Sequence, residues 1–506
     1  MSSVLAALAM ASLITIPSAD SLEIVQPSPD GMGFELSEPG VPFVLFGANA
    51  VVDTGDPDDP WALYLLTPEG WNPERLDRML DGAADLGMNH IKAFLPIGHV
   101  LPDPQPVDGA VLVEGTEERV LALLDAAEAR GIRISLALAA WGGNGCEWWQ
   151  EGGQYWGAMD RVMPRDSFAT LADFWRQIAL LCHGRGALLS YNLATEWTLP
   201  NINLTWQREH DGLVPGPHAL PAFRYYLHLL YEDDIDALSL AWGQELASFE
   251  DVTLPDLSWD GESYGSPDGK VRDWNEFREW TSRRYLRVQA EAIREADPAH
   301  MVTCGVHGRT PAGQWPGSAM HVMGCTSRDL ADLLDYVTVH HYVQSGDVEK
   351  GLRMGELLAR FAWNGAPVVI EEFGYMPADD EPDPGSTTAD VMIDLMRRTA
   401  DDVAGWSVWY YTNTRGATAL DLEGEVRYGP YDSGWELTEL GRRLRELSAE
   451  GFFTGPTTRV PPEDVLFVDR AECMVPREMG ILLKIAADWD AYEHPVGFEY
   501  PPPPLD

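Results

Sequence analysis

Short apolar and β-branched runs alternate with amphipathic stretches throughout residues 40–450, and this alternation constrains the fold more than any other feature of the sequence. Strands that alternate with helices form a parallel sheet, since each strand is joined to the next by a helical crossover. Eight such strand and helix pairs predict an α/β fold, the (β/α)8 or TIM barrel. The expected strands are residues 43–49, 89–95, 132–139, 187–196, 301–307, 335–341, 367–373 and 405–411.

The amphipathic stretches have the periodicity of helices that cover the outside of a barrel. In the first of them, Leu76, Met79, Leu80 and Ala83 fall on one helical face, and Gly87 follows as a stop signal. The expected helices are residues 74–86, 118–130, 167–183, 275–296, 326–334, 352–363, 388–402 and 436–449.

Three segments lie outside the repeating pattern, so we divide the chain into residues 1–20, a barrel over 21–454 and an extension over 455–506. Residues 1–20 resemble a secretory signal peptide without its leading basic residue, which predicts a secreted or periplasmic protein; a hydrophobic tail is the alternative. Residues 198–274 form a long insertion after the fourth strand, where it would wall or cover the active face. The proline-rich extension predicts one or two strands and is expected to be partly disordered.

The charge of the chain limits its partners. It has 80 acidic and 35 basic residues, a formal net charge of −45, which suits solubility or adaptation to salt. Such a surface repels nucleic acid, anionic membranes and uronic-acid polymers, so we expect a neutral partner. The five cysteines form no C-x-x-C pair, and we expect neither a metal nor an organic cofactor. The sequence gives no indication of the oligomeric state.

Two of the expected strands end in glutamate, which is unusual because an isolated ionised carboxylate is costly to bury. The fourth strand ends at Glu196 and the seventh at Glu371 and Glu372. In a barrel these residues meet at one face, where active groups lie. Two carboxyl groups facing each other across a sugar are the groups that break glycosidic bonds. Strand alternation allows only one of the two adjacent glutamates to face the barrel, but sequence alone does not fix which.

The segment 367–374, PVVIEEFG, resembles the strand-seven signature of clan A glycoside hydrolases, particularly glycoside hydrolase family 5 with its cellulases and mannanases. The resemblance extends to residues 335–342 (strand six), 405–409 (strand eight), 46–49 (strand one) and 86–89, and so covers about residues 35–450. It implies that Glu372, directly before Phe-Gly, is the nucleophile, and Glu371 is then expected to face outward toward a helix.

The resemblance also implies roles for other residues. Glu196 would be the acid/base of a retaining mechanism, and Tyr342 and His340 would contact the nucleophile. Tryptophans would stack on sugar rings. The expected substrate-binding residues are Asn49, Lys92, Trp141, Thr195, Trp197, His340, Tyr342 and Trp409.

The sequence departs from the family pattern at two of these positions. Thr195 stands where the family has an asparagine that binds the sugar 2-hydroxyl, and Lys92 stands where it has an arginine. We expect a retaining hydrolase of β-linked neutral poly- or oligosaccharides of the mannan or glucan type. The alternatives are an exo-acting β-glycosidase, such as a β-mannosidase or β-galactosidase, and a catalytically inactive carbohydrate-binding barrel.

Overall fold

The protein is described by a computed structural model that covers most of the barrel and parts of the insertion and the C-terminal extension. The described residues are 22–37, 40–53, 61–62, 65–101, 105–106, 109–139, 165–195, 219–255, 269–305, 327–377, 384–415, 425–426, 428–455, 464–467 and 496–499.

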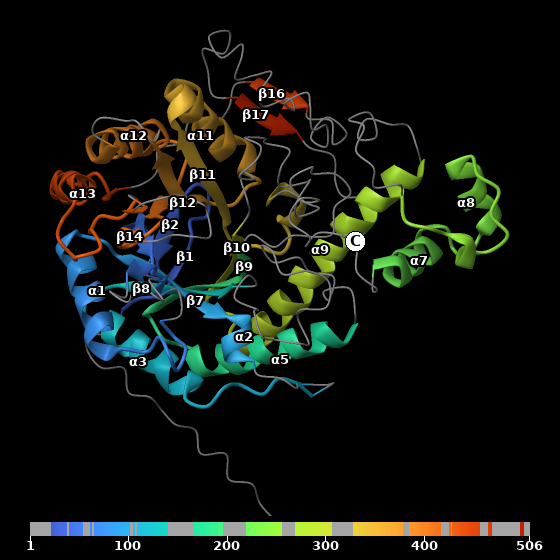
Figure 1. The fold of residues 1–506 in the computed structure, drawn as a ribbon, viewed down its shortest axis with the longest axis horizontal. Coiled ribbons are helices and arrows are strands. Elements are labelled where there is room, and N and C mark those ends of the chain that lie inside the picture. The colour runs from blue at the N-terminus through green and yellow to red at the C-terminus, as the bar shows by residue number, and fades with distance from the viewer. Residues whose placement is uncertain are drawn as a thin grey trace, which may run out of the picture.

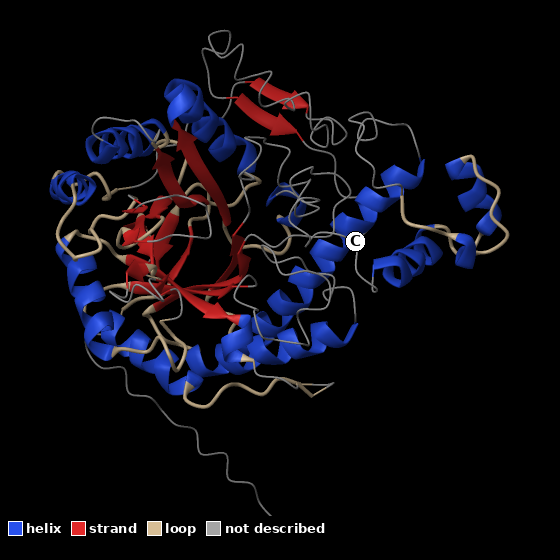
Figure 2. Cartoon of the chain, in the orientation of Figure 1, coloured by secondary structure: helices blue, strands red, loops and turns tan. Residues whose placement is uncertain are grey.

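The centre of the fold is an eight-stranded sheet whose hydrogen-bonded order is β10-β9-β8-β7-β4-β13-β12-β11. All seven strand pairings are parallel, and following the order round gives the chain order of a barrel, so the predicted (β/α)8 architecture is confirmed. Figure 2 shows the strands enclosed by helices. The strands are β4 (Leu45–Asn49), β7 (His90–Pro96), β8 (Arg133–Ala139), β9 (Leu188–Thr195), β10 (Met301–Gly305), β11 (Val337–Gln344), β12 (Val368–Met376) and β13 (Gly405–Val408).

The barrel is closed between the two ends of this order, β10 and β11, largely by side chains. The Asp335 carboxylate accepts from the Val302 amide at 2.7 Å, and the Asp335 amide donates to the Val302 carbonyl at 2.9 Å. The Thr303 hydroxyl donates to the Tyr336 carbonyl at 2.8 Å, and the Thr338 hydroxyl donates to the Cys304 carbonyl at 2.6 Å. Asp335 and the two threonine hydroxyls therefore hold together the seam of the barrel.

Helices surround the sheet, as Figure 1 shows. Most expected helices are present within a few residues of their predicted bounds. Helix α1 starts with Pro73 in its first turn, and the Asn72 side chain caps it by accepting from the Arg75 amide. The helices around the barrel are α1 (Pro73–Asp85), α2 (Ile97–Val100), α3 (Thr116–Glu128), α5 (Arg165–Cys182), α9 (Gly269–Ala296), α11 (Val348–Ala362), α12 (Pro384–Arg398) and α13 (Glu439–Ala449).

One helix prediction is wrong. Residues 326–334 were expected to form an α-helix, but the described part of this segment holds only the 3-10 turn η4 (Ser327–Leu330), followed by a turn. Leu330, Leu333 and Leu334 are nevertheless buried, so their helical spacing reflects packing against the barrel. A single turn is enough to bury all three before the chain enters β11.

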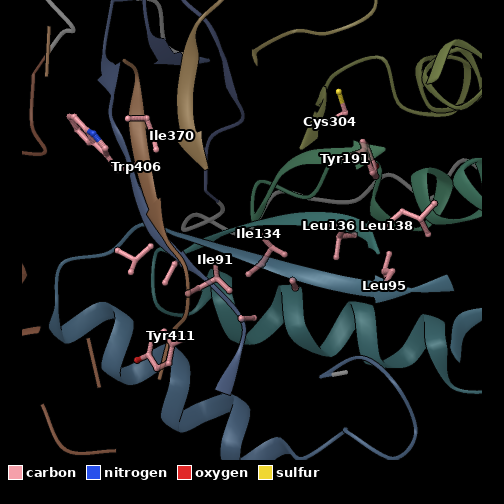
Figure 3. Close-up of a cluster of buried hydrophobic side chains, with 14 of the residues drawn as sticks. Ile91, Leu95, Ile134, Leu136, Leu138, Tyr191, Cys304, Ile370, Trp406 and Tyr411 are labelled. Atoms are coloured by element: carbon pink, nitrogen blue, oxygen red, sulfur yellow. The ribbon is translucent and has the colours of Figure 1, made fainter. Parts of the chain in front are cut away.

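The main hydrophobic core lies between the outer face of the sheet and the helices. Figure 3 shows Ile91, Ile134 and Leu136, which project from β7 and β8 into this layer. A smaller cluster closes the amino-terminal end of the barrel, where the antiparallel strands β1 (Val25–Pro27), β2 (Phe34–Leu36) and β3 (Pro42–Phe43) contribute Val25, Phe34 and Phe43. These two clusters leave the opposite, carboxyl-terminal face for polar groups.

The insertion after β9 has a core of its own. Helices α7 (Ala219–Leu230) and α8 (Ile235–Trp242) and the turn η3 (Phe249–Asp251) lie to one side of the barrel, beside the first half of α9 (Figure 1). Phe223 and Tyr226 of α7 pack on Trp274 and Phe277 of α9. The insertion was expected to end at residue 274, but α9 begins at Gly269, so a barrel helix extends to support it.

The C-terminal extension supplies a parallel pair, β16 (Asp464–Phe467) and β17 (Val496–Glu499), which lies near α11 (Figure 1). Two short antiparallel pairs complete the described strands: β5 (Val52–Asp53) with β6 (Trp61–Ala62), and β14 (Thr414–Arg415) with β15 (Glu425–Val426). Residues 1–20, expected to be a signal peptide, and the last residues of the extension 455–506, expected to be partly disordered, lie outside the described residues. Within the described part of the chain, no helix combines the length and apolar character needed to span a membrane.

The closure of the barrel can be tested with Thr338→Val, which keeps the shape of the side chain and removes its hydroxyl. We expect a loss of about 1–3 kcal/mol in the free energy of unfolding, because the buried Cys304 carbonyl loses its hydroxyl donor. Denaturant titration of the variant and the wild type measures it.

Thr281→Val is the matched control. The buried Thr281 hydroxyl donates to the Phe277 carbonyl, which is also a backbone acceptor within the same helix, so removing the hydroxyl does not leave that carbonyl without a donor. We expect its effect to be close to zero. Equal losses in the two variants would contradict the role of Thr338 in barrel closure.

Candidate active site

Buried polar side chains converge at the carboxyl ends of the barrel strands. We call this group the strand-end cluster. Five of the eight barrel strands contribute to it, and each member is at least half buried. Its members are Asn49 (β4), Lys92 (β7), Asn192 (β9), His340 and Tyr342 (β11), and Glu371 and Glu372 (β12).

Strand β12 brings two consecutive glutamates into the barrel because it contains a bulge. Val339 of β11 pairs with Ile370, but the next residue, His340, pairs with Glu372, which leaves Glu371 as an extra residue. A bulge interrupts the alternation of side chains between the two faces of a strand. Both glutamates consequently reach Lys92, and the expectation that Glu371 faces outward is wrong.

Lys92 bridges the two carboxylates. Its Nζ lies 2.9 Å from Glu371 Oε2 and 3.1 Å from Glu372 Oε1, and its side chain is completely buried. Burial is the largest single influence and would lower the pKa of Lys92, but the two carboxylates outweigh it and raise the pKa above its usual value. Lys92 is therefore a fixed positive charge.

Glu371 is contacted by side chains from three other strands. Asn192 Nδ2 donates to both of its oxygens, at 2.8 and 3.0 Å, and His340 Nε2 lies 3.3 Å from Oε2. Burial, the largest influence, opposes its ionisation, but Lys92 and His340 together lower the pKa of Glu371 to about 2. Glu371 is therefore ionised at neutral pH.

Glu372 has a different set of neighbours, closer to the strand ends. Tyr342 OH donates to Glu372 Oε2 at 3.2 Å, and His340 Nδ1 lies 3.3 Å from the same oxygen. Tyr342 is half-buried and packs with Trp409, Tyr410 and Tyr428 in an aromatic group at this end of the barrel. Lysine, histidine and tyrosine thus surround the Glu372 carboxylate.

The two adjacent histidines of β11 face opposite sides of the strand, as the alternation of side chains along a strand requires. His340 lies between the carboxylates, whereas His341 Nε2 contacts the Gly351 carbonyl of α11 at 2.7 Å. Within the described residues, no group of three or more His, Cys, Asp or Glu side chains has the arrangement to hold a metal ion. The strand-end cluster combines two carboxylates with the Lys92 ammonium and with histidine, tyrosine and asparagine side chains.

A chain of hydrogen bonds crosses the barrel interior beneath the cluster. His90 Nε2 contacts Ser135 Oγ, Ser135 Oγ contacts Ser190 Oγ, and Ser190 Oγ contacts Tyr336 OH, each at 2.8 Å. Burial lowers the pKa of His90 to about 3, and its ring is neutral at pH 7. This layer is polar but uncharged, in contrast to the strand-end cluster above it.

Asn49 of the cluster and two further predicted site residues, Thr195 and Trp409, lie at the strand ends. The Asn49 amide donates to the Glu371 carbonyl at 2.9 Å and to the Val408 carbonyl at 3.2 Å, so it supports the backbone of β12 and β13. Thr195 ends β9 and is buried next to Gly305. Trp409 is half-buried and packs edge-on against Phe94, with ring centres 6.0 Å apart. Its peptide bond to Tyr410 is cis.

Three predicted site residues, Glu196, Trp141 and Trp197, lie outside the described residues. Conversely, Asn192 and Glu371 of the cluster were not among the expected site residues. Asn192 is an amide near the middle of a strand that the pattern predicts to be buried, which was a usable signal. Glu371 required knowledge of the bulge, which depends on the pairing of β12 with β11.

A segment of the chain matches a glycosidase family. Residues 207–387, less than half of the chain, match the family model Glyco_hydro_42, described as Beta-galactosidase. A search of curated proteins gives no match. The matched family belongs to the glycoside hydrolases but is not family 5, so the finer resemblance drawn from the sequence motifs is not confirmed.

Solved structures of glycosidases share the fold. A GH5_18 protein from Streptomyces cattleya, solved with Manb1-4GlcNAc, is 15% identical, with 90% of this chain and 94% of that chain covered and a TM-score of 0.57. The GH42 beta-galactosidase Gan42B from G. stearothermophilus is 14% identical, with coverages of 90% and 65% and a TM-score of 0.66. The exo-beta-1,4-mannosidase Op5Man5 from Opitutaceae bacterium strain TAV5 is 16% identical, with coverages of 97% and 73% and a TM-score of 0.57.

The charge of Glu371 predicts a specific dependence of stability on pH. Its pKa is lowered by folding, so its stabilising contribution is complete above the unfolded value of about 4.3 and is lost as the pH falls toward 2. The contribution is about 3 kcal/mol at neutral pH and roughly half of that at pH 3. We expect the stability difference between wild type and Glu371→Gln to shrink accordingly in denaturant titrations between pH 6 and pH 3.

Glu349→Gln provides the comparison. The Glu349 pKa is also lowered, mainly by a hydrogen bond from Arg398, but its side chain is 53% exposed and the pair is screened by water. Its variant should follow the pH dependence of the wild type closely. A constant stability difference for Glu371→Gln across the pH range would show that the Glu371 charge does not carry the effect.

Proposed function

We propose that this protein is a retaining glycoside hydrolase that cleaves β-linked neutral sugars, with Glu372 as the nucleophile and Glu196 as the acid/base. The observation that carries the proposal is the setting of Glu372, a carboxylate at the end of barrel strand seven that is held by Lys92, His340 and Tyr342. The glycosidase fold and the family match of residues 207–387 support it.

The surroundings of Glu372 suit the first step of double displacement. A nucleophilic carboxylate must be ionised and correctly oriented before it attacks the anomeric carbon. Lys92 supplies positive charge, and the Tyr342 hydroxyl fixes the orientation of one oxygen. In this mechanism Glu196 protonates the leaving oxygen and then activates the water that releases the sugar.

The substitution of lysine for the family's arginine is compatible with this role. Lysine lacks the planar fork of arginine, but its ammonium carries three donors that can reach separate acceptors. Lys92 uses them to contact both glutamates. This geometry favours an active enzyme over the inactive carbohydrate-binding barrel, because the charge next to Glu372 is retained.

Two classes of substrate fit the proposal. The motifs resemble enzymes that act on mannans and glucans, whereas the family match is described as Beta-galactosidase and one structural neighbour is an exo-mannosidase. An exo-acting enzyme is the second candidate, and the insertion beside α9 favours it if it closes one end of the cleft. Digestion of β-mannan, β-glucan and aryl β-glycosides with product sizing separates the two, and sugar binding without any product would support the inactive barrel.

We further propose that the protein is exported, on the basis of the apolar N-terminal segment. The strongly acidic composition favours a neutral carbohydrate over nucleic acid or anionic membranes as its partner.

Glu372→Gln tests the nucleophile. We expect turnover of an activated aryl β-glycoside to fall by about 10⁴-fold or more, because the amide cannot form the glycosyl-enzyme. The melting temperature should show that the variant is folded. Turnover close to that of the wild type would remove Glu372 from the mechanism.

Glu196→Ala tests the acid/base and separates it from the nucleophile. Substrates with good leaving groups need little protonation, so their hydrolysis should fall far less than that of natural glycosides. Added azide should restore product formation as a β-glycosyl azide, since it replaces the water that Glu196 activates. Equal losses on both substrate classes without azide rescue would contradict the assignment.

A further inference from the structure

We propose that Glu371, a buried carboxylate that the proposed mechanism does not use, is a positioning residue that holds Lys92 in place for Glu372. Glu371 is the bulge residue of β12 and lies directly before the proposed nucleophile. The effect of Glu371 on turnover rests on the proposed function, whereas its effect on the position of Lys92 does not.

Lys92 needs a second anchor. Its side chain is fully buried, and its Nζ lies 5.2 Å from the ring centre of Phe94, so one side of the ammonium faces an aromatic surface. Glu371 provides the shorter of its two carboxylate contacts, at 2.9 Å compared with 3.1 Å to Glu372. With two carboxylates as acceptors, the ammonium is fixed between them.

Glu371 is itself rigidly held from the opposite side. Asn192 donates to both carboxylate oxygens through its amide nitrogen, while its amide oxygen accepts from the Gly305 amide at 3.1 Å. A Cβ at Gly305 would lie 3.2 Å from His340 Nε2 and 3.3 Å from Glu371 Oε2. Glycine at the end of β10 thus lets the backbone approach the carboxylate closely, and the Glu371 position is determined by β9, β10 and β11 together.

The charges also support this role. Glu371 is ionised and shares the positive charge of Lys92 with Glu372. Without the Glu371 charge, Lys92 would interact with the Glu372 carboxylate alone. This would overstabilise the unreacted nucleophile, and the Lys92 ammonium would be free to move toward Glu372. Glu371 would therefore set both the position and the strength of the contact between Lys92 and Glu372.

The first test observes Lys92 directly and needs no activity. The chain contains four lysines, so lysine-selective ¹³C and ¹⁵N labelling gives at most four side-chain signals, and Lys92→Met identifies that of Lys92. We expect Glu371→Gln to lower the pKa of Lys92, because one of the two carboxylates that raise it loses its charge, and to speed the exchange of its ammonium protons. Glu371→Asp, whose carboxylate is retracted by one methylene, should give a smaller change in the same direction.

Asp402→Asn is the matched control. Asp402 is a buried carboxylate that pairs with Arg360 of α11 at 3.0 Å, in the helical layer outside the barrel. The Asp402→Asn variant should have a lower melting temperature and an unchanged Lys92 signal. A Lys92 signal and titration unchanged in Glu371→Gln would overturn the proposal.

The second test measures whether Glu371 acts through Lys92. We expect Glu371→Gln to lower kcat by about 10²-fold with KM changed by less than about 3-fold, because the reacting groups are misplaced while sugar binding remains. The double variant with Lys92→Met should be no slower than Lys92→Met alone. If the loss of kcat in the double variant equals the product of the losses in the two single variants, Glu371 acts independently of Lys92 and the proposal is overturned.

The two tests also separate this inference from the proposed function. If the wild type hydrolyses no glycoside, the proposed function fails and the Lys92 titration alone decides whether Glu371 positions Lys92. If the wild type is active and the Lys92 signal is unchanged in Glu371→Gln, the positioning role fails and the proposed function stands.

Discussion

A lysine ammonium buried between two carboxylates is the interaction around which the candidate site is built. Lys92 is fully enclosed and contacts Glu371 and Glu372, and His340 lies against both acids. Removing one partner from such a buried group costs about 3–5 kcal/mol, because the remaining charge is left uncompensated. The strand-end cluster is therefore constrained as a unit, and the two glutamates can have different roles: Glu371 is enclosed by donors from β7, β9 and β11, whereas Glu372 lies beside the half-buried Tyr342.

The barrel provides the geometry that this cluster requires. Parallel strands bring their carboxyl ends to one face, so residues from β4, β7, β9, β11 and β12 meet although they are far apart in the sequence. The bulge in β12 adds a second inward-facing acid to that face. Beneath it, an uncharged chain of hydrogen bonds runs from His90 through Ser135 and Ser190 to Tyr336. The helices and the outer core stabilise the barrel, and the threonines of β10 and β11 close it.

The sequence predicted the architecture well because a barrel repeats the same pattern eight times, and an error in one helix, such as the segment 326–334, does not change the topology. It also identified Glu372, Lys92, His340, Tyr342 and Asn49, which the structure brings together. It misplaced Glu371, since strand alternation assumes a regular strand and the bulge arises only from the pairing of β12 with β11. Asn192 was missed for a related reason: its role depends on a partner 179 residues away in the sequence.

The central claim is that the two adjacent glutamates of β12 differ in function and that Glu372 alone attacks the sugar. Covalent trapping with an activated 2-deoxy-2-fluoro β-glycoside, followed by peptide fragmentation in the mass spectrometer, distinguishes them directly. The account predicts one label per chain, attached to Glu372. A label on Glu371, or a chain that turns over unmodified glycosides without ever forming the adduct, would contradict it.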